Sequence, residues 1–383
     1  MKKTNKITKQ KSTVTKKISN LATVRSKVTK LHIVLPVLIL AITAVVWSAM
    51  TPSALTLAPP APGSDLALAQ AAQAQFGSKY KNLSVAKIDA NTGMVKYANF
   101  GATNTTEYEI GSISKTFVGL LMADAINRGE VTEDTKLYQK LPISSFYPSA
   151  QLTLAELASH RSGLPSVPST PDMLVAAANY QLTGANLFPF TRSQLLNQTR
   201  LTFFLPTRGS YQYSNMGASL EGHAIAAAAG TNYKTLLQNR ILTPLQLAHT
   251  RILFSPDDIT ASTTRGTRSD GKVMQPYAGE GYAPAATMRS TIGDMASYAL
   301  KVMKNQAPGM SALTPRWPAA PGQQVGYNWF TDSKGRAWHN GKTGGFTSML
   351  MLDKVTGKGI VVLSNTDVIV DNGAISLLEN PGV

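Results

Sequence analysis

The sequence predicts an α+β fold, in which an antiparallel sheet is flanked by helices and joined by a mostly helical subregion. Three observations predict it: a β-hairpin early in the folded part, amphipathic helices in the middle, and a series of short strands near the end. Helices enclosed between an early hairpin and late antiparallel strands indicate a single domain, residues 65–383.

Each element follows from a local signal. Asp65 begins an Ala/Leu/Gln-rich helix that ends near Gly77. Residues 83–89 and 94–100 form the hairpin, because a Gly-containing turn separates two apolar strands. The helix over residues 111–129 has apolar residues at i, i+4 spacing. The other predicted segments are a Pro/Thr-rich lid or loop region with weak helices (166–210), helices at 216–229, 233–240, 293–304 and 374–379, and strands at 325–331, 347–353 and 359–364.

The positive charge of the chain is concentrated at its N-terminus. The 383 residues carry 37 Lys and Arg against 21 Asp and Glu, a formal net charge of +16. Ten of the basic residues lie in residues 1–31, and the remainder of the chain has 27 basic against 21 acidic residues. No nucleic-acid partner is therefore expected. We expect residues 1–31 to be a basic cytoplasmic tail near anionic lipid.

An apolar segment follows the tail. Ile33–Met50 has 18 residues without a charge and as a helix would be about 27 Å long, close to the hydrocarbon thickness of a bilayer. Because the basic residues precede it, we expect an uncleaved transmembrane helix over residues 32–50, which contacts the membrane through residues 33–50 and leaves the domain outside the cytoplasm. The alternatives are a cleaved signal peptide with a secreted domain, and a buried core helix. Residues 51–64, with four prolines, predict an extended Pro/Ala-rich linker.

Several chemistries are excluded by residue type. The absence of Cys removes disulfides, thiolate metal sites and a cysteine nucleophile. The five histidines have no metal-ligand spacing, so no metal site is expected. We expect no other cofactor. No Gly-x-Ser-x-Gly nucleophile motif occurs. The sequence carries no signal for an oligomeric state.

Ser112 and Lys115 form a candidate nucleophilic pair. They lie one helical turn apart at the start of the helix over 111–129, so their side chains share a face. A serine hydroxyl needs a base, and a lysine serves as one when burial or a neighbouring charge lowers its pKa. Ser-x-x-Lys occurs four times in the chain, but only this copy begins a strongly amphipathic helix.

Tyr213 and Asn215 form a second candidate motif. Of three Tyr-x-Asn matches, only Tyr213-Ser-Asn215 follows a Pro-Thr-Arg-Gly turn and precedes a helix of small residues. A phenol in that position can project from a loop into a cleft.

Three segments, in this order, resemble the active-site motifs of class C β-lactamases and low-molecular-weight, DD-carboxypeptidase-like penicillin-binding proteins. They are Tyr108-Glu-Ile-Gly-Ser-Ile-Ser-Lys-Thr-Phe117, Tyr213-Ser-Asn215 and His339-Asn-Gly-Lys-Thr-Gly-Gly-Phe346. Segments 157–165, 285–295 and 359–365 are also similar, so the resemblance covers about residues 80–366. It implies a β-lactamase/transpeptidase-like fold with the site between the helical region and the sheet.

The resemblance also implies a serine hydrolase that acts through an acyl-enzyme. Ser112 would be acylated, Lys115 and Tyr213 would share the proton transfer, and Asn215 would hold the amide side of the substrate. The oxyanion would be bound by the backbone N–H of Ser112 and by one on the strand that carries the third motif. The implied substrate is a small molecule or a peptidoglycan-type peptide.

The third motif has two alignments. Lys342-Thr-Gly344 spells the usual triplet, whereas anchoring on the Gly-Gly-Phe that ends at Phe346 places His339-Asn340-Gly341 there. We favour the second, in which His339 and Gly341 contact the substrate and Lys342 supplies the second oxyanion N–H. A histidine in this position attracts a substrate carboxylate only when it is protonated.

From this alignment, and from the short stretch of chain between Asn215 and His339, we expect a D-Ala-D-Ala carboxypeptidase or endopeptidase-like cell-wall enzyme. A carboxylesterase and then a β-lactamase are the next activities within the same family. The competing class is a non-catalytic penicillin-binding sensor or scaffold, which would be acylated without turning over.

Overall fold

The computed structural model describes residues 55–383. The basic tail, the expected transmembrane segment and the first residues of the expected linker lie outside the described residues. Within residues 55–383, none of the helices combines the length and apolar character needed to span a bilayer.

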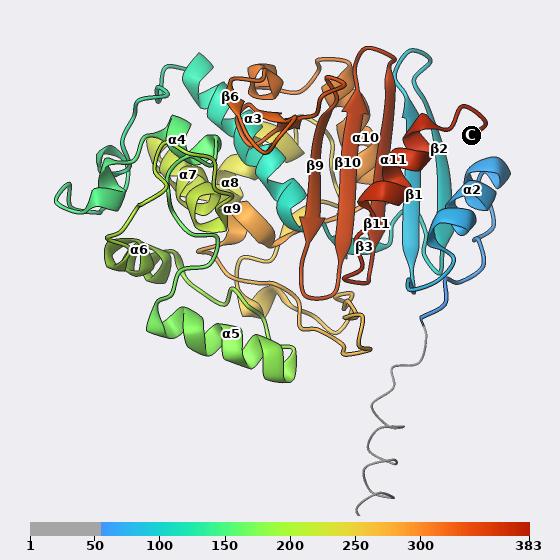
Figure 1. The fold of residues 1–383 in the computed structure, drawn as a ribbon, viewed down its shortest axis with the longest axis horizontal. Helices are drawn as coiled ribbons and strands as arrows, with labels where there is room; N and C mark the ends of the chain where they lie inside the picture. The colour runs from blue at the N-terminus through green and yellow to red at the C-terminus, as the bar shows by residue number, and fades with distance from the viewer. Residues whose placement is uncertain (1–54) are drawn as a thin grey trace, which may run out of the picture. The chain divides into compact units, whose positions relative to one another are not determined.

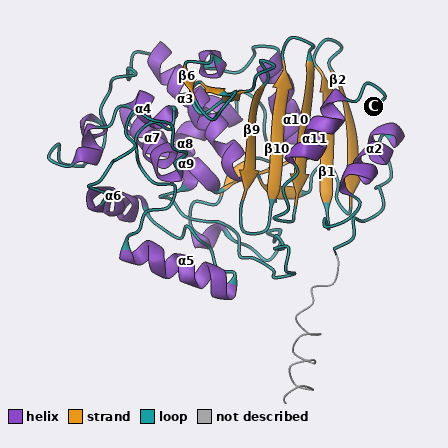
Figure 2. Cartoon of the chain, viewed as in Figure 1, coloured by secondary structure: helices purple, strands orange, loops and turns teal. Residues whose placement is uncertain are grey.

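The domain is built around an eight-stranded sheet with the order β2-β1-β11-β10-β9-β8-β7-β6, antiparallel throughout (Figures 1 and 2). Its strands are β1 (Leu83–Asp89), β2 (Met94–Phe100), β6 (Trp317–Pro318), β7 (Gln324–Val325), β8 (Phe330–Thr331), β9 (Ala337–Lys342), β10 (Thr347–Asp353) and β11 (Lys358–Ser364). The early hairpin therefore pairs with the late strands, through β1 against β11. The predicted α+β class with an antiparallel sheet is confirmed.

Both faces of the sheet are buried, which explains the continuous apolar runs in its central strands. In β11, Val361 and Leu363 pack with α10 (Ile292–Met303) and the helical region. The alternate residues Ile360 and Val362 pack on the other face, with α2 (Leu66–Phe76) and α11 (Asp371–Glu379). Figure 1 shows α11 and α2 on the near side of the sheet and α10 behind it.

The helical region lies beside β9 and is organised around α3 (Ser114–Asn127), which packs against α7 (Asn215–Ala228) and α9 (Ala283–Ala286) (Figure 1). Gly119 on α3 has no room for a side chain, because an added Cβ would overlap the Tyr327 carbonyl. The remaining helices are α4 (Leu154–Ala158), α5 (Pro171–Thr183), α6 (Arg192–Leu201) and α8 (Tyr233–Leu237).

A small three-stranded sheet joins β3 (Glu107–Glu109), β5 (Met288–Thr291) and β4 (Arg251–Ile252). Arg289 crosses it and pairs with Glu107 and, at 3.0 Å, with Glu109. Arg289 and Glu109 are both buried. Burial raises the pKa of Glu109, and the neighbouring Arg289 opposes that rise.

The region 166–210, expected to be a lid or loop region with weak helices, contains the two helices α5 and α6. Thr191 caps α6: its hydroxyl accepts a hydrogen bond from the backbone N–H of Gln194, whose side chain binds back to Thr191 N. The Pro/Thr composition reflects helix starts as well as turns.

The strand predicted over 325–331 is divided into β7 and β8. The turn between them contains Asn328 in the left-handed conformation (φ 56°). Its side-chain amide donates to the buried carboxyl of Glu221 on α7, 2.8 Å away. A contact across the fold therefore holds Asn328 in the turn that separates the two strands.

Residues 55–64, the described part of the expected linker, are extended but packed. Leu57 is buried, and the backbone N–H of Ala61 donates to the Asn99 carbonyl on β2 at 2.7 Å. The folded body therefore includes residues that precede Asp65.

Candidate active site

Ser112 lies in a 3₁₀ turn (Gly111–Ile113) that precedes α3, so the α-helix begins two residues after it. Gly111 has a positive φ of 50°, and a Cβ there would lie 2.8 Å from the backbone nitrogen of Lys342. Only glycine permits this close approach. The turn that carries Ser112 is therefore held directly against the end of β9.

Lys115 is fully buried and its Nζ has three hydrogen-bond partners. These are Ser112 Oγ at 2.9 Å, Asn215 Oδ1 at 2.7 Å and the backbone carbonyl of Ala285 at 3.0 Å. Burial lowers the pKa of Lys115 well below its ordinary value of 10.5. The structure thus brings together Ser112, Lys115 and Asn215 from two distant parts of the chain.

The partners of Lys115 determine how a neutral amine would be oriented. The Ala285 carbonyl can only accept a hydrogen bond. Asn215 Oδ1 also accepts, because the amide nitrogen of the same side chain donates to Ser166 Oγ at 2.8 Å. With its two N–H groups used on these oxygens, a neutral Lys115 directs its lone pair at the Ser112 hydroxyl. This is the geometry required of a general base.

Tyr213 lies on the loop that leads into α7, next to Ser214, whose hydroxyl caps the helix by accepting from Gly217 N at 2.8 Å. Lys115 Nζ lies 4.9 Å from the centre of the Tyr213 ring. The phenol oxygen is buried and has no hydrogen-bond partner among the described residues. Burial raises the pKa of Tyr213 above its ordinary value. Tyr213 is therefore a neutral phenol that can pass a proton onward.

His339 is buried on β9, with its ring centre 6.3 Å from that of Tyr213. Its Nδ1 lies 2.6 Å from the carbonyl of Asn340 and must carry the proton, since a carbonyl oxygen only accepts. Its Nε2 is left with a lone pair and without a partner among the described residues. Burial, and then the amine of Lys115 in its protonated form, lower the pKa of His339 to about 3. His339 is thus neutral at physiological pH, which does not suit the attraction of a carboxylate.

The rest of the third motif is divided between the two sides of β9. Asn340 donates to Asp371 of α11 at 2.6 Å, on the outer face of the sheet. Gly341 has no room for a side chain, because a Cβ would overlap the Ile110 carbonyl just before the Ser112 turn. The side chain of Lys342 is 55% exposed, with Nζ 3.8 Å from Asp367. The two alignments of the third motif begin at His339 or at Lys342, and it is the side chain of His339 that lies close to Tyr213 and Lys115.

Three groups near the site were not identified from the sequence. The Ala285 carbonyl is a backbone atom, which no residue pattern marks. Ser166 lies in the Pro/Thr-rich region and positions Asn215. His160 packs on Tyr213 with ring centres 4.4 Å apart. His160 and Ala285 fall within segments that carried the family resemblance, which was the only available signal.

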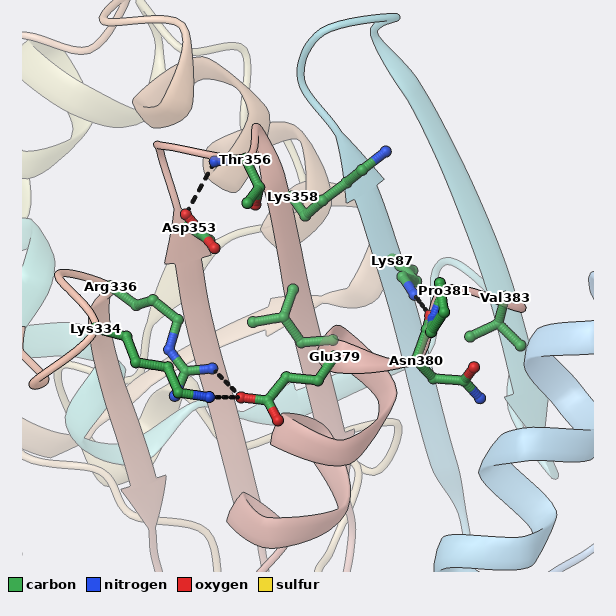
Figure 3. Close-up of a pocket in the computed structure, with 11 residues that line it drawn as sticks. Lys87, Lys334, Arg336, Asp353, Thr356, Lys358, Glu379, Asn380, Pro381 and Val383 are labelled. Atoms are coloured by element: carbon green, nitrogen blue, oxygen red, sulfur yellow. Dashed lines mark hydrogen bonds and ion pairs between the residues drawn. The ribbon is translucent and has the colours of Figure 1, made fainter.

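A hollow of about 580 Å³ lies at the other end of β9, next to Arg336 (Figure 3). Its cations have partners: Lys334 and Arg336 bind Glu379, and Lys358 binds Asp89. Lys87 donates to the carbonyls of Leu377 and Asn380 (2.9 and 2.6 Å). The residues that line the hollow include Thr356 but no Ser, Tyr or His, so it lacks the set of side chains found around Ser112.

Within residues 55–383 there is no group of three or more His, Asp or Glu side chains arranged to hold a metal ion. The chemistry of the candidate site is that of a hydroxyl, an amine, a phenol and an imidazole.

A serine hydroxyl in contact with a buried lysine amine, between an antiparallel sheet and a helical region, is an arrangement typical of proteins that catalyse acyl transfer through a serine. The family model described as Beta-lactamase matches residues 69–376, and the chain belongs to this family. The resemblance inferred from the sequence is confirmed, and membership supports a serine hydrolase in general.

Similar proteins include a Beta-lactamase of Escherichia coli (strain K12), 31% identical over 211 residues, which cover 53% of this chain and 49% of that protein. Beta-lactamase-like protein 2 of Dictyostelium discoideum is 28% identical over 199 residues, 49% of this chain and 34% of that protein. Protein flp of Staphylococcus aureus (strain COL) is 24% identical over 280 residues, 69% of this chain and 54% of that protein. The matched region spans about half or less of the length of these relatives.

Proposed function

We propose that this protein is a serine acyl-hydrolase that forms an acyl-enzyme on Ser112. The observation that carries the proposal is the position of Lys115: its buried amine lies 2.9 Å from Ser112 Oγ, and its pKa is lowered well below 10.5. A buried neutral amine in hydrogen-bond contact with a hydroxyl is an activated nucleophile.

In this mechanism Lys115 removes the proton of Ser112 as its oxygen attacks the substrate carbonyl. The backbone N–H groups of Ser112 and Lys342, which the Gly111 turn holds close together, bind the developing oxyanion. Tyr213, whose ring centre lies 4.9 Å from Lys115 Nζ and whose hydroxyl has no partner among the described residues, passes the proton to the leaving group. A water molecule then attacks the acyl-enzyme with the proton transfers reversed.

The protonation state of His339 affects whether the site favours a substrate with a carboxylate or a neutral one. A D-Ala-D-Ala peptidase binds a terminal carboxylate, but His339 presents a lone pair and has a pKa of about 3. A neutral ester or amide is not repelled by that lone pair. We therefore place carboxylester hydrolysis ahead of the D-Ala-D-Ala peptidase activity expected from the sequence, which stands as the second candidate.

The location of the enzyme is a separate proposal. The basic tail and the apolar segment 33–50 support a single-pass anchor with the domain outside the cytoplasm. Protease treatment of intact cells that express the full chain should degrade the domain and spare a short N-terminal fragment. A domain that is protected until the cells are lysed would contradict this location.

The test of function is turnover of three substrates: a short-chain p-nitrophenyl ester, an acyl-D-Ala-D-Ala peptide and nitrocefin. We expect the ester to be hydrolysed fastest, and Ser112→Ala to abolish all turnover. Ser269→Ala is the matched control, because Ser269 begins another Ser-x-x-Lys match in an exposed loop. Turnover that survives in Ser112→Ala would refute the proposal, and stoichiometric acylation without turnover would support the sensor class instead.

A further inference from the structure

His160 is bound to the backbone on both sides of Tyr213. It follows α4 in a loop and has a positive φ of 56°, which is uncommon for a residue other than glycine. Its carbonyl accepts from the N–H of Gln212 at 2.7 Å. Its ring nitrogen Nδ1 lies 3.3 Å from the N–H of Ser214 and accepts from it. One residue thus fixes both neighbours of Tyr213.

The imidazole of His160 also packs directly on the phenol. The two ring centres are 4.4 Å apart, with the planes inclined by 41°. Phe330 of β8 lies nearly parallel to the imidazole at 6.0 Å, and Tyr211 meets its edge at 6.3 Å. Because His160 is itself fully buried among these rings, it has little freedom to move away from Tyr213.

The hydrogen bond from Ser214 also determines the proton position on His160. Since Nδ1 accepts, Nε2 carries the hydrogen, and this Nε2 has no partner among the described residues. Burial lowers the pKa of His160 well below 6.5, and Lys115 or His339 would lower it further if protonated. The ring therefore stays neutral, and Nδ1 remains available as the acceptor for Ser214.

From these contacts we propose that His160 is a positioning residue, which holds Tyr213 in place for proton transfer through its Nδ1 acceptor and its ring contact. The proposal rests on the proposed function, because it assigns Tyr213 a role in acyl transfer. Loss of the Nδ1 acceptor removes the hydrogen bond from the Ser214 N–H. The phenol of Tyr213 is then no longer fixed beside Ser112. A misplacement of about 1 Å in a reacting geometry can slow a reaction by about 100-fold.

The test compares variants in full-length protein by their rate of labelling with a fluorophosphonate probe. His160→Leu keeps a similar volume without an acceptor, and His160→Gln carries its amide too far along the side chain to replace Nδ1. Asparagine places Oδ1 near the Nδ1 position and tolerates a positive φ. We expect labelling to fall about 10- to 100-fold in His160→Leu and His160→Gln, and His160→Asn to restore most of it.

The same substitutions in a Tyr213→Phe background separate positioning from general destabilisation. If His160 acts through Tyr213, His160→Leu has little further effect once the phenol oxygen is absent, because the two effects are then not additive. His223→Leu is the control for the loss of a buried neutral histidine: its Nε2 contacts the Glu280 and Gly281 carbonyls, and labelling should persist.

Equal losses with and without the Tyr213 hydroxyl would overturn the proposal, as would wild-type labelling in both His160→Leu and His160→Gln. If His160→Asn is labelled as slowly as His160→Gln, the hydrogen bond to Nδ1 does not position Tyr213. If wild-type protein is not labelled at all, the proposed function itself fails, so the two failures are distinguishable.

Discussion

Replacing Lys115 by methionine removes the proposed base while nearly preserving the shape of a fully buried side chain. Loss of general base catalysis costs about 10²- to 10⁴-fold in rate, which corresponds to about 3–5 kcal/mol in the activation barrier. The backbone hydrogen bonds at the ends of the Ser112 turn and of α3 do not involve the amine. We therefore expect Lys115→Met to fold but to be acylated at least about 100 times more slowly.

The effect of Lys115→Met on stability has two opposing parts. Asn215 Oδ1 and the Ala285 carbonyl each lose a donor, at about 1–3 kcal/mol per buried group. In the other direction, the variant no longer buries an amine whose charged form is penalised by desolvation. The net change in the free energy of unfolding should thus be smaller than the change in the activation barrier.

The pH dependence of the wild-type protein follows from the lowered pKa of Lys115. Between the folded pKa and the unfolded value near 10.5, the unfolded chain binds more protons than the folded one, so stability rises with pH across that window. Acylation needs the neutral amine and falls as pH drops below the folded pKa. Lys115→Met should lose both dependences.

The assay is the pseudo-first-order rate of fluorophosphonate labelling across a pH series, with urea unfolding measured on the same samples. A Lys115→Met variant labelled within threefold of wild type would refute the assignment of the base. A wild-type labelling midpoint near 10.5, the ordinary lysine value, would refute the argument from burial.

Three further predictions follow from other contacts. Asn215→Ala removes a partner of Lys115 and the link to Ser166, so labelling should slow by about 10- to 100-fold, as expected for a misplaced base; an unchanged rate would contradict this. His339→Ala should lower kcat/KM for neutral esters at least as much as for carboxylate-bearing esters, because the ring, neutral above its pKa of about 3, presents a lone pair that does not attract a carboxylate; a selective loss on the carboxylate substrate would assign His339 to anion binding. Arg289→Met leaves Glu109 buried without its partner and should lower the free energy of unfolding in urea by about 3–5 kcal/mol; a loss below 1 kcal/mol would show that the pair is not buried as described.

The sequence predicted those parts of the fold that a short segment determines by itself. The hairpin β1–β2 has the predicted bounds, because Gly93 takes the positive φ of 77° that its turn requires. The prediction of a single strand over 325–331 is wrong, because the turn inside it is held by a residue that is distant in sequence. Asn328 turns the chain there and is held by Glu221, 107 residues away in sequence.

In the candidate site, too, one part was predictable from the sequence and another was not. The order and context of the motifs were sufficient to select Ser112, Lys115 and Tyr213, which the structure brings together. Charge states were not predictable, because they depend mainly on burial, which only the packed fold determines. The hydrogen-bond roles were not predictable either, because the Ala285 carbonyl accepts from the amine of Lys115 and the Asn340 carbonyl accepts from His339 Nδ1–H.

The most direct measurement is the location of the covalent adduct after treatment with a fluorophosphonate, by mass spectrometry of the intact protein and of its peptides. The account predicts one adduct per chain, on the peptide that contains Ser112, and none in Ser112→Ala. An adduct on any other serine, or a wild-type protein that stays unmodified while correctly folded, would contradict it.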